Sequence, residues 1–316
     1  MSDLGEVPAK RAEGAARSRW LNKDHVEKSL DGNLMQGKIC LVTGGTTGIG
    51  KVAATVLAAQ GAQVIITGRD AQRTMEAAEY IKDESGNPSV QYLSADFSDL
   101  RQVRDLAAAF KERYSRLDVL LNNAGAFYNT RVKTPYGVEM TFLVNHLAPF
   151  LLTGQLLDVL RNSAPARIVN VSSDAHQYGT LNFDDLGFKR GYFGIKAYGR
   201  SKLANVLFTY ELARRLDVTG VTVNAVHPGH VATNIWKTNF SIFGPALKYI
   251  MSFFALSPQQ GADTLIYLAA SPEVAGITGK YFVGRKAVPS SPLSYDEAIA
   301  KRLWEVSESL TSRTNA

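Results

Sequence analysis

From residue 38 onward, short apolar runs rich in β-branched residues alternate with longer stretches of helical periodicity. A helix between two strands is the usual crossover between parallel neighbours. The alternation therefore predicts an α/β fold with one parallel, doubly wound sheet and helices on both faces. Such sheets bind ligands at the carboxyl ends of their strands. We expect seven strands, with the sequences KICLV, QVIIT, SVQYL, DVLL, RIVNV, VTVNAV and KYFV.

The helical type is clearest in residues 98–110. Ser98 is of a residue type that caps helix N-termini, and we predict it as the N-cap. The apolar residues of the stretch fall on one face, as expected of a helix that covers a sheet. They are Leu100, Val103, Leu106, Ala107 and Phe110.

The chain divides into an extension and one folded domain. Residues 1–36 are polar and rich in Gly, Ala and charged residues, with one short helical stretch near residues 19–30. The regular pattern occupies residues 37–316, and no internal repeat or low-complexity linker interrupts it. We therefore predict a single domain.

Composition excludes several classes of protein. The single cysteine, Cys40, rules out a disulfide framework and is expected in the core. The formal net charge is +6, but Lys and Arg form no block of five or more, which argues against a nucleic-acid partner. There is no run of about 18 apolar residues for a transmembrane span. The charged N-terminus lacks an apolar signal core, so we expect a cytoplasmic location.

The first predicted strand leads directly into a glycine-rich turn, Thr43-Gly44-Gly45-Thr46-Thr47-Gly48-Ile49-Gly50, and then into a helix. Glycines let a backbone approach a pyrophosphate, and a helix N-terminus offers free N–H groups. The turn predicts a dinucleotide site, the alternative being an ordinary strand–helix turn. The stretch from Gly45 to Lys51 also fits part of the NTPase phosphate loop. That loop needs Ser or Thr next, for magnesium, and this chain has Val52.

The end of the second strand distinguishes NADP from NAD. An NAD site usually places an acidic residue there, about 20 positions beyond the glycines, to bind the ribose 2′-hydroxyl. Here that position holds Gly68, and the following Arg69 can grip a 2′-phosphate with two hydrogen bonds. We therefore expect NADP(H) as the cofactor. The alternative is a solvated Arg69 that Asp70 neutralises.

Four motifs occur in the order in which one enzyme family carries them. They are Thr43-Gly44-x-x-x-Gly48-x-Gly50, Asn122-Asn123-Ala124-Gly125, Val171-Ser172-Ser173 and Tyr198-Gly199-Arg200-Ser201-Lys202, and His227-Pro228-Gly229 agrees as a fifth. Over residues 37–285 the chain resembles the short-chain dehydrogenase/reductase family, which implies a Rossmann-type domain and hydride transfer between nicotinamide and an alcohol/carbonyl pair. Residues 167–176, 201–215 and 279–310 look most similar to its retinol-dehydrogenase-like branch.

Tyr198 and Lys202 are four residues apart, so on a helix they share one face. An ammonium about 4 Å from a phenol, at an effective dielectric of about 20, contributes roughly 4 kcal/mol, or about three pKa units. This argument predicts a Tyr198 pKa of about 7, suited to general acid/base catalysis. The resemblance adds that Lys202 binds the nicotinamide ribose, Ser173 the substrate oxygen, and Asn145 a proton-relay water.

Two neighbouring serines compete for the substrate-binding position. Ser172 and Ser173 are adjacent on a strand, so their side chains point to opposite faces. The family motif favours Ser173. The gap of 25 residues from Ser173 to Tyr198 is long for the family and leaves the loop geometry open.

A second pair, Tyr192 and Lys196, also makes Y-x-x-x-K. Glycines at positions 191 and 194 argue against a helix there. Tyr198, by contrast, opens a long helical run. We therefore predict Tyr198 as the catalytic tyrosine.

The resemblance also implies cofactor-binding residues at the strand ends. Asp96 would contact adenine; the alternative is that it only begins the next helix. Asn123-Ala124-Gly125 would flank the cofactor, the alternative being an ordinary turn. Pro228-Gly229 would lie beside the nicotinamide, and the alternative there is a plain loop. In sequence order all of these positions fall on one sheet edge. The complete predicted set is Gly44, Thr46, Thr47, Gly48, Ile49, Gly50, Arg69, Asp96, Phe97, Asn123, Ala124, Gly125, Tyr198, Lys202, Pro228, Gly229 and Val231.

Large apolar residues crowd the segment after Gly229. Its position, residues 231–258, is where the family keeps a mobile substrate lid. The composition predicts a lipophilic substrate such as a steroid, terpenoid, retinoid or aromatic ketone. Core packing or a subunit contact in a homo-oligomer is the alternative, and shallow membrane contact is a third.

Together, these features predict an NADP(H)-dependent oxidoreductase that interconverts a lipophilic ketone or aldehyde and its alcohol. With NADPH, carbonyl reduction is the expected direction, and no metal site is predicted. A catalytically silent NADP(H)-sensing or scaffold protein of the same fold is the alternative, which the intact motifs disfavour. A nucleotide-sugar epimerase shares Y-x-x-x-K but usually has another glycine spacing and a larger C-terminal substrate region.

Overall fold

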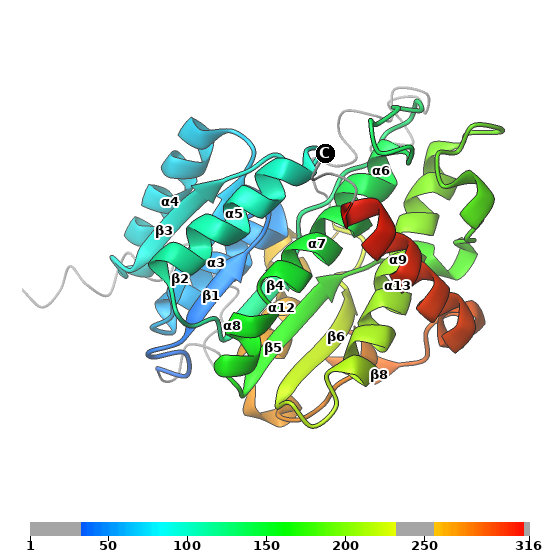
Figure 1. The fold of residues 1–316 in the computed structure, drawn as a ribbon. Coiled ribbons are helices and arrows are strands. Elements are labelled where there is room, and N and C mark those ends of the chain that lie inside the picture. Colours follow the sequence, from blue (N-terminus) through cyan, green and yellow to red (C-terminus); the bar gives the residue numbers. More distant parts are fainter. Residues whose placement is uncertain (1–32, 232–255, 313–316) are drawn as a thin grey trace, which may run out of the picture.

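Eight strands form one sheet in the residues that the computed structural model describes, 33–231 and 256–312 (Figure 1). Their order is β3-β2-β1-β4-β5-β6-β7-β8. Neighbours from β3 to β7 pair in parallel, whereas β8 runs antiparallel to β7. The strands are β1 Ile39–Val42, β2 Gln63–Gly68, β3 Val90–Ser94, β4 Val119–Asn122, β5 Ala166–Val171, β6 Val221–His227, β7 Lys280–Val283 and β8 Lys286–Val288.

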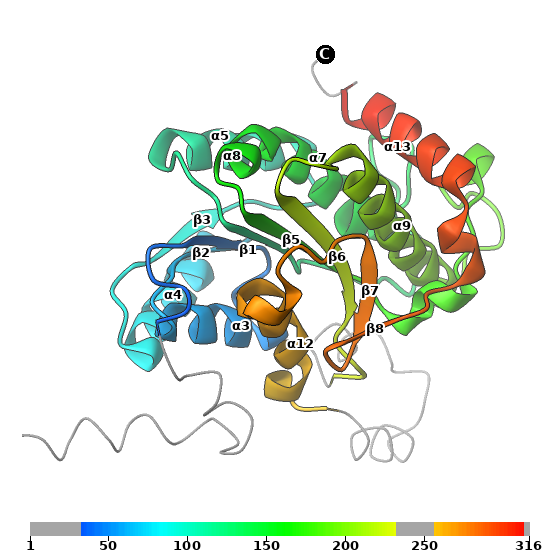
Figure 2. The same cartoon turned by 90° about the horizontal axis from the view of Figure 1, so that it is seen from below.

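Helices cover both faces of the sheet, so the predicted doubly wound α/β fold is confirmed. Figure 2 shows α3, α4 and α12 against one face, and α5, α7, α8, α9 and α13 against the other. The longer helices are α3 Gly48–Ala59, α4 Ala71–Ser85, α5 Leu100–Arg113, α7 Ala148–Gln155, α8 Leu157–Asn162, α9 Gly194–Arg215, α12 Pro258–Ala270 and α13 Glu297–Ser312. The short ones are α6 Met140–Phe142, η2 Leu143–Leu147, η3 Asp174–Tyr178, η4 Phe183–Asp185, η5 Pro272–Val274 and η6 Pro292–Tyr295.

Two hydrophobic cores lie between these layers, because alternate strand residues point to opposite faces. In β1, Cys40 and Val42 join the core under α3, whereas Leu41 joins the core under α5. Cys40 is fully buried, as predicted. Strands that are buried on both faces explain the continuous apolar runs in the sequence.

The predicted strand count was one too low. β7 and β8 form a hairpin whose two turn residues, Gly284 and Arg285, have φ of 54° and 63°, the conformation of a tight primed turn. Arg285 is held there because its N–H donates to Thr264 Oγ1 at 3.2 Å and its guanidinium pairs with Asp263. A three-residue edge strand is too short to give a periodic signal.

Two predicted regions fall mainly outside the described residues. Residues 1–32, with the predicted helical stretch, and residues 232–255, the main part of the predicted lid, are among those not described. Within the described ranges, no helix combines the length and the apolar character that crossing a membrane would require.

The chain order places the sheet's switch point between β1 and β4. After β3 the chain returns to the other side of β1, so the crossovers from β1 and β4 diverge to opposite faces. Ligands of open α/β sheets bind in the crevice beyond the carboxyl ends of such strands. The glycine-rich turn follows β1, and residues 123–125 follow β4, so both lie at this point.

At the opposite end of the same strand pair, Asp118 ties β1 to β4. Its side chain is 2% exposed and accepts from Lys38 Nζ at 3.0 Å, Ile39 N at 2.9 Å and Arg116 Nη2 at 2.7 Å. Burial by itself raises the pKa of Asp118, but the hydrogen bonds from Arg116, Ile39 and Lys38 outweigh it and lower that pKa.

Asp118→Asn should lower the free energy of unfolding by about 2 kcal/mol at neutral pH, because charge-assisted hydrogen bonds are lost. A depressed folded pKa stabilises above the ordinary value of 3.8, and this contribution disappears as pH falls below it. The difference between the two proteins in urea unfolding should therefore shrink as pH falls from 3.8 through the lower folded pKa of Asp118. Asp158→Asn, in an exposed pair with Lys111, is the control and should cost under about 0.5 kcal/mol. Equal effects of the two substitutions would contradict this account.

Candidate active site

One hydroxyl holds the ends of β1 and β4 together. Thr43 Oγ1 donates to Leu121 O at 3.1 Å and accepts from Asn123 N at 2.9 Å and Ala124 N at 3.0 Å. The Asn123 amide donates in return to the carbonyls of Thr43 and Gly44, at 2.8 and 3.1 Å. The glycine-rich turn and the loop after β4 therefore lie side by side. Sequence reasoning gave Thr43 no role, although its place at the head of the turn was the signal.

Glycine is required at two points of this turn for different reasons. Gly44 has a φ of 65°, in the left-handed region that favours glycine. Gly50 is required for close approach, since a Cβ there would lie 2.3 Å from Asn123 Nδ2 and 2.5 Å from Gly44 O. The turn is thus packed directly against the loop after β4.

The N-terminus of α3 lies at the same edge of the sheet, because the helix begins within the glycine-rich turn. The side chain of the N-cap, Thr47, makes no capping hydrogen bond, and no acidic residue occupies the first turn. The first N–H groups of a helix have no intrahelical partner, and the helix dipole adds partial positive charge there. These features fit the pyrophosphate of a dinucleotide.

The end of β2 borders the glycine-rich turn. A Cβ on Gly68 would lie 2.5 Å from Thr46 Cγ2. Asp70 caps α4 by accepting from Arg73 N at 2.9 Å, so its carboxylate is engaged at that helix N-terminus. Arg69 is exposed directly after β2, where the sequence predicts a 2′-phosphate.

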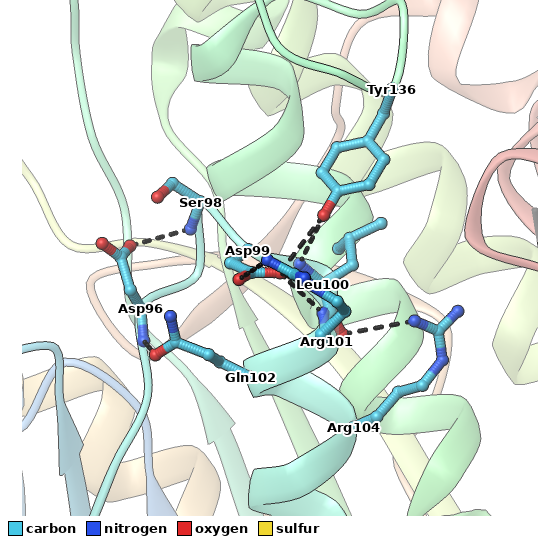
Figure 3. A network of polar contacts seen from close by, with 8 residues as sticks. All are labelled: Asp96, Ser98, Asp99, Leu100, Arg101, Gln102, Arg104 and Tyr136. Carbon is cyan, nitrogen blue, oxygen red and sulfur yellow. Dashed lines mark hydrogen bonds and ion pairs between the residues drawn. The ribbon is translucent and has the colours of Figure 1, made fainter. Parts of the chain in front are cut away.

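Asp96 lies in the tight turn between β3 and α5 (Figure 3). Its Oδ1 accepts from Ser98 N at 2.9 Å, and its own N–H donates to Gln102 Oε1 at 3.0 Å. Phe97 is buried in the core, so its side chain anchors the turn. The predicted adenine position is therefore a rigid turn at the expected strand end.

The predicted N-cap of α5 was wrong by one residue. Asp99 caps the helix, accepting from Arg101 N at 3.0 Å, whereas Ser98 lies one residue earlier, in a turn where its N–H donates to the Asp96 carboxylate (Figure 3). Hydrogen bonds from Arg101 lower the pKa of Asp99 to about 2. Both residues are good capping types, so their order alone did not decide between them.

Asn145 lies in η2, a single π-helical turn between α6 and α7. Its Oδ1 accepts from Ala126 N at 2.7 Å, and its Nδ2 donates to Ala126 O at 2.9 Å and Ser201 Oγ at 3.0 Å. A Cβ on Gly125 would lie 3.4 Å from Asn145 Oδ1 and 3.8 Å from Lys202 Nζ, so both groups border Gly125. Such π turns often mark functional sites, and this one braces the loop after β4 against α9.

Tyr198 and Lys202 lie one turn apart in α9. Lys202 Nζ is 5.4 Å from the centre of the Tyr198 ring and donates to Val171 O at 3.0 Å. Ser173 hydrogen-bonds to the Tyr198 side chain, whereas Ser172 Oγ donates to Lys202 O at 2.8 Å. The fold thus brings Ser173, and not Ser172, to the phenol.

Burial dominates the pKa of Tyr198. Desolvation raises this pKa above its ordinary value of 10.0, and the hydrogen bond with Ser173 acts in the opposite direction. The pKa of about 7 expected from Lys202 is therefore wrong. The expectation considered only the charge of Lys202. In the folded chain the Tyr198 phenol is desolvated, and the Lys202 ammonium donates to the Val171 carbonyl. Burial also lowers the pKa of Lys202 to about 8.

The competing tyrosine, Tyr192, lies just before α9, which begins at Gly194. Its hydroxyl donates to Tyr128 O at 2.6 Å, and Lys196 is exposed. Tyr192 and Lys196 are therefore not paired along a helix face. The glycine at position 194 does not prevent a helix, as the sequence argument assumed, but starts one.

The long loop before α9 packs closely on that helix. A Cβ on Gly179 would lie 2.4 Å from Gly199 O, so the loop and helix backbones touch. The Arg200 guanidinium is 4.0 Å from the Phe188 ring centre and donates to Asp185 O at 2.8 Å. The long stretch between Ser173 and Tyr198 forms the short helices η3 and η4, which pack on α9. Ser173 still lies beside Tyr198.

The segment after β6 packs next to the first turn of α3. A Cβ on Gly261 in α12 would lie 2.4 Å from Val231 Cγ2 and 2.8 Å from Ile49 Cγ2. Val231 is therefore placed beside the glycine-rich turn. Pro228-Gly229, immediately before it, leads out of the sheet at the same edge.

Comparison with known proteins agrees with this arrangement. A family model described as short chain dehydrogenase matches residues 38–241. Human retinol dehydrogenase 14 is 44% identical over 293 residues, which cover 88% of this chain and 87% of that protein. A crystal structure of a Mycobacterium paratuberculosis protein is 32% identical with a TM-score of 0.70, over 88% of this chain and 94% of that one. The Pseudomonas aeruginosa RhlG/NADP active-site complex is 29% identical with a TM-score of 0.65, and the match covers 79% of this chain and 96% of that one.

Gly50→Ala should weaken the binding of a reduced nicotinamide dinucleotide at least about tenfold, because the new Cβ displaces the turn from Asn123. Fluorescence titration of the nicotinamide measures the affinity. Gly154→Ala is the control, since a Cβ at that position meets nothing within 4 Å. Unchanged affinity in a folded Gly50→Ala protein would remove the turn from the binding site.

Proposed function

The chain belongs to the short-chain dehydrogenase family, and from this premise we propose that it is an NADP(H)-dependent oxidoreductase acting on lipophilic carbonyls and alcohols. Membership of the family makes it an oxidoreductase that uses a nicotinamide dinucleotide. The proposal adds the choice of NADP(H), the roles of the catalytic residues and the class of substrate.

One observation supports the catalytic proposal above all others. Ser173 at the end of β5 and Tyr198 and Lys202 on α9 come together beside Gly125 and Asn145, at the carboxyl edge of the sheet. These side chains come from three separate elements. A polar, buried cluster of this kind at the switch point is what hydride transfer to a carbonyl requires of a protein.

In the proposed mechanism, a bound nicotinamide supplies or accepts the hydride. Ser173 Oγ, which already reaches Tyr198, orients the carbonyl oxygen by a hydrogen bond. Tyr198 donates its phenolic proton to that oxygen as negative charge develops there. Lys202 adds positive charge next to the phenol, and Asn145 keeps the loop after β4 in position for the cofactor. A proton-relay water at Asn145 remains part of the proposal.

The pKa directions favour carbonyl reduction. Burial raises the pKa of Tyr198, so at neutral pH the residue is a protonated phenol, the form that donates. A developing alkoxide is a much stronger base than a phenolate, so the transfer is downhill. With a pKa of about 8, Lys202 still carries its charge at neutral pH.

Arg69 supports NADP(H) over NAD(H). It is exposed directly after Gly68, the position where an NAD site would present a carboxylate. Asp70 is engaged as the cap of α4, which leaves the guanidinium to bind a 2′-phosphate. The structural relative from Pseudomonas aeruginosa is itself an NADP complex.

The substrate proposal rests on composition and on the relatives. The segment after β6 carries many large apolar residues in sequence, and relatives at 44% and 43% identity are named retinol dehydrogenases. We therefore extend the proposal to a retinoid-like, lipophilic aldehyde or ketone and its alcohol. A cytoplasmic location and a homo-oligomer stay predictions of the sequence.

Tyr198→Phe should reduce turnover of retinal with NADPH by about 100-fold or more, because the proton donor is removed. Cofactor affinity should be retained, since the ring remains. Tyr192→Phe is the matched control, because its hydroxyl is bonded to Tyr128 O, and it should keep most of the activity. A Tyr198→Phe protein with normal turnover would defeat the assignment, and inactivity of the unaltered protein with all carbonyls would favour a silent, cofactor-sensing protein.

Arg69→Ala should raise the KM for NADPH about tenfold or more and leave that for NADH nearly unchanged, because only NADPH carries the 2′-phosphate. Steady-state kinetics with both cofactors measures the ratio. Arg73→Ala, which removes an exposed arginine from α4, serves as the control. Equal changes for the two cofactors in Arg69→Ala would show that Arg69 does not select between them.

A further inference from the structure

A cluster of metal-ligating side chains lies beside Ser173, outside the groups used in hydride transfer. Asp174 begins η3, His227 ends β6, and His230 follows shortly after; one ligand atom from each lies within 4.8 Å of the others. His230 Nε2 is 3.0 Å from Asp174 Oδ2, and the rings of His227 and His230 are 5.5 Å apart.

His227 provides an independent indication of a ligand. Its side chain is buried, with the residue 8% exposed, and its Nδ1 has no hydrogen-bond partner among the described residues. A buried polar atom without a partner is costly, and in native proteins it often signals an ion or a water. Here the unpartnered nitrogen belongs to a ring that is already part of the three-residue cluster.

We propose that Asp174, His227 and His230 bind a divalent transition-metal ion of the Zn²⁺ type. Two imidazoles and one carboxylate suit Zn²⁺ and its neighbours in the first transition row, whereas Mg²⁺ and Ca²⁺ prefer oxygen ligands alone. Tetrahedral Zn²⁺, with bonds of about 2.0–2.2 Å, holds its ligand atoms about 3.4 Å apart. Three protein ligands leave a fourth position for water.

The cluster can contract onto an ion because two of its three side chains are exposed enough to change rotamer. His227 is fixed at the end of a central strand, whereas the side chains of Asp174 and His230 are 46% and 77% exposed. The ligand atoms of the three residues lie within 4.8 Å of one another. Small rotations of the Asp174 and His230 side chains would bring these atoms to coordination distance of one ion bound to the His227 imidazole. The sequence gave no metal signal, because Asp174 joins the two histidines only through the pairing of β5 with β6.

Metal binding here would act on the catalytic serine. Asp174 Oδ1 accepts a hydrogen bond from Ser173 Oγ at 2.9 Å. A carboxylate that coordinates an ion is a weaker and differently placed acceptor, so the Ser173 hydroxyl is reoriented. Zn²⁺ is therefore expected to inhibit carbonyl reduction reversibly, a consequence that rests on the proposed function.

Calorimetric titration of the full, tag-free chain with ZnCl₂ tests the site without reference to activity. We expect one ion per chain, no comparable heat with MgCl₂, and an affinity at least about tenfold lower in His230→Ala and in Asp174→Asn, since a direct ligand matters at least as much as its outer-shell partners. His230 is largely exposed, so this variant should keep its unfolding temperature. His25→Ala, which removes a histidine of the N-terminal extension, is the matched control.

Zinc binding that is absent from the unaltered protein, or equally strong in His230→Ala and Asp174→Asn, would overturn the metal site. X-ray absorption of the zinc complex should show two nitrogen neighbours at about 2.0–2.1 Å, and a shell of oxygen alone would overturn it as well.

Activity measurements then test the regulatory consequence. Micromolar Zn²⁺ should inhibit retinal reduction by the unaltered protein, EDTA should restore the rate, and His230→Ala should resist inhibition relative to its own metal-free rate. Zinc that binds without inhibiting would overturn the consequence for Ser173. If no carbonyl is reduced at all, the proposed function fails while calorimetry still decides the metal site.

Discussion

The parallel pairing of β1 with β4 is the constraint on which the rest of the site depends. It creates the switch point of the sheet, and Thr43 and Leu121 meet there although 78 positions separate them in the sequence. One threonine hydroxyl then fixes the glycine-rich turn against the loop after β4. These hydrogen bonds hold the turn, the loop after β4 and the N-terminus of α3 together at one edge of the sheet.

Burial has opposite effects on Tyr198 and Lys202, the two side chains to which we assign the central catalytic roles. It raises the pKa of Tyr198 and lowers that of Lys202, since each charged form loses solvation. The phenol therefore keeps its proton, while the ammonium becomes only marginally charged above neutrality. In the proposed mechanism this pairing suits the donation of a proton to a substrate oxygen, the step that carbonyl reduction requires.

Much of the fold and the site could be predicted because local sequence determines them. Alternating runs specify the doubly wound sheet, and helical spacing places Tyr198 and Lys202 on one helix one turn apart. Other features could not be predicted. β8 is too short to show a period, and Ser98 and Asp99 are both good capping types, so the sequence did not decide which one caps α5. The desolvation of Tyr198 exists only in the folded chain. The Asp174–His227–His230 cluster belongs to the same class.

The most direct test of the account is a crystal structure of the protein with NADP⁺ bound. The account predicts the pyrophosphate at the N-terminus of α3, the 2′-phosphate against Arg69, and the nicotinamide ring beside Tyr198, with Lys202 Nζ within hydrogen-bonding distance of its ribose. A nicotinamide bound elsewhere, or oriented away from Tyr198 and Lys202, would contradict the central claim that these residues act together at the reacting carbon.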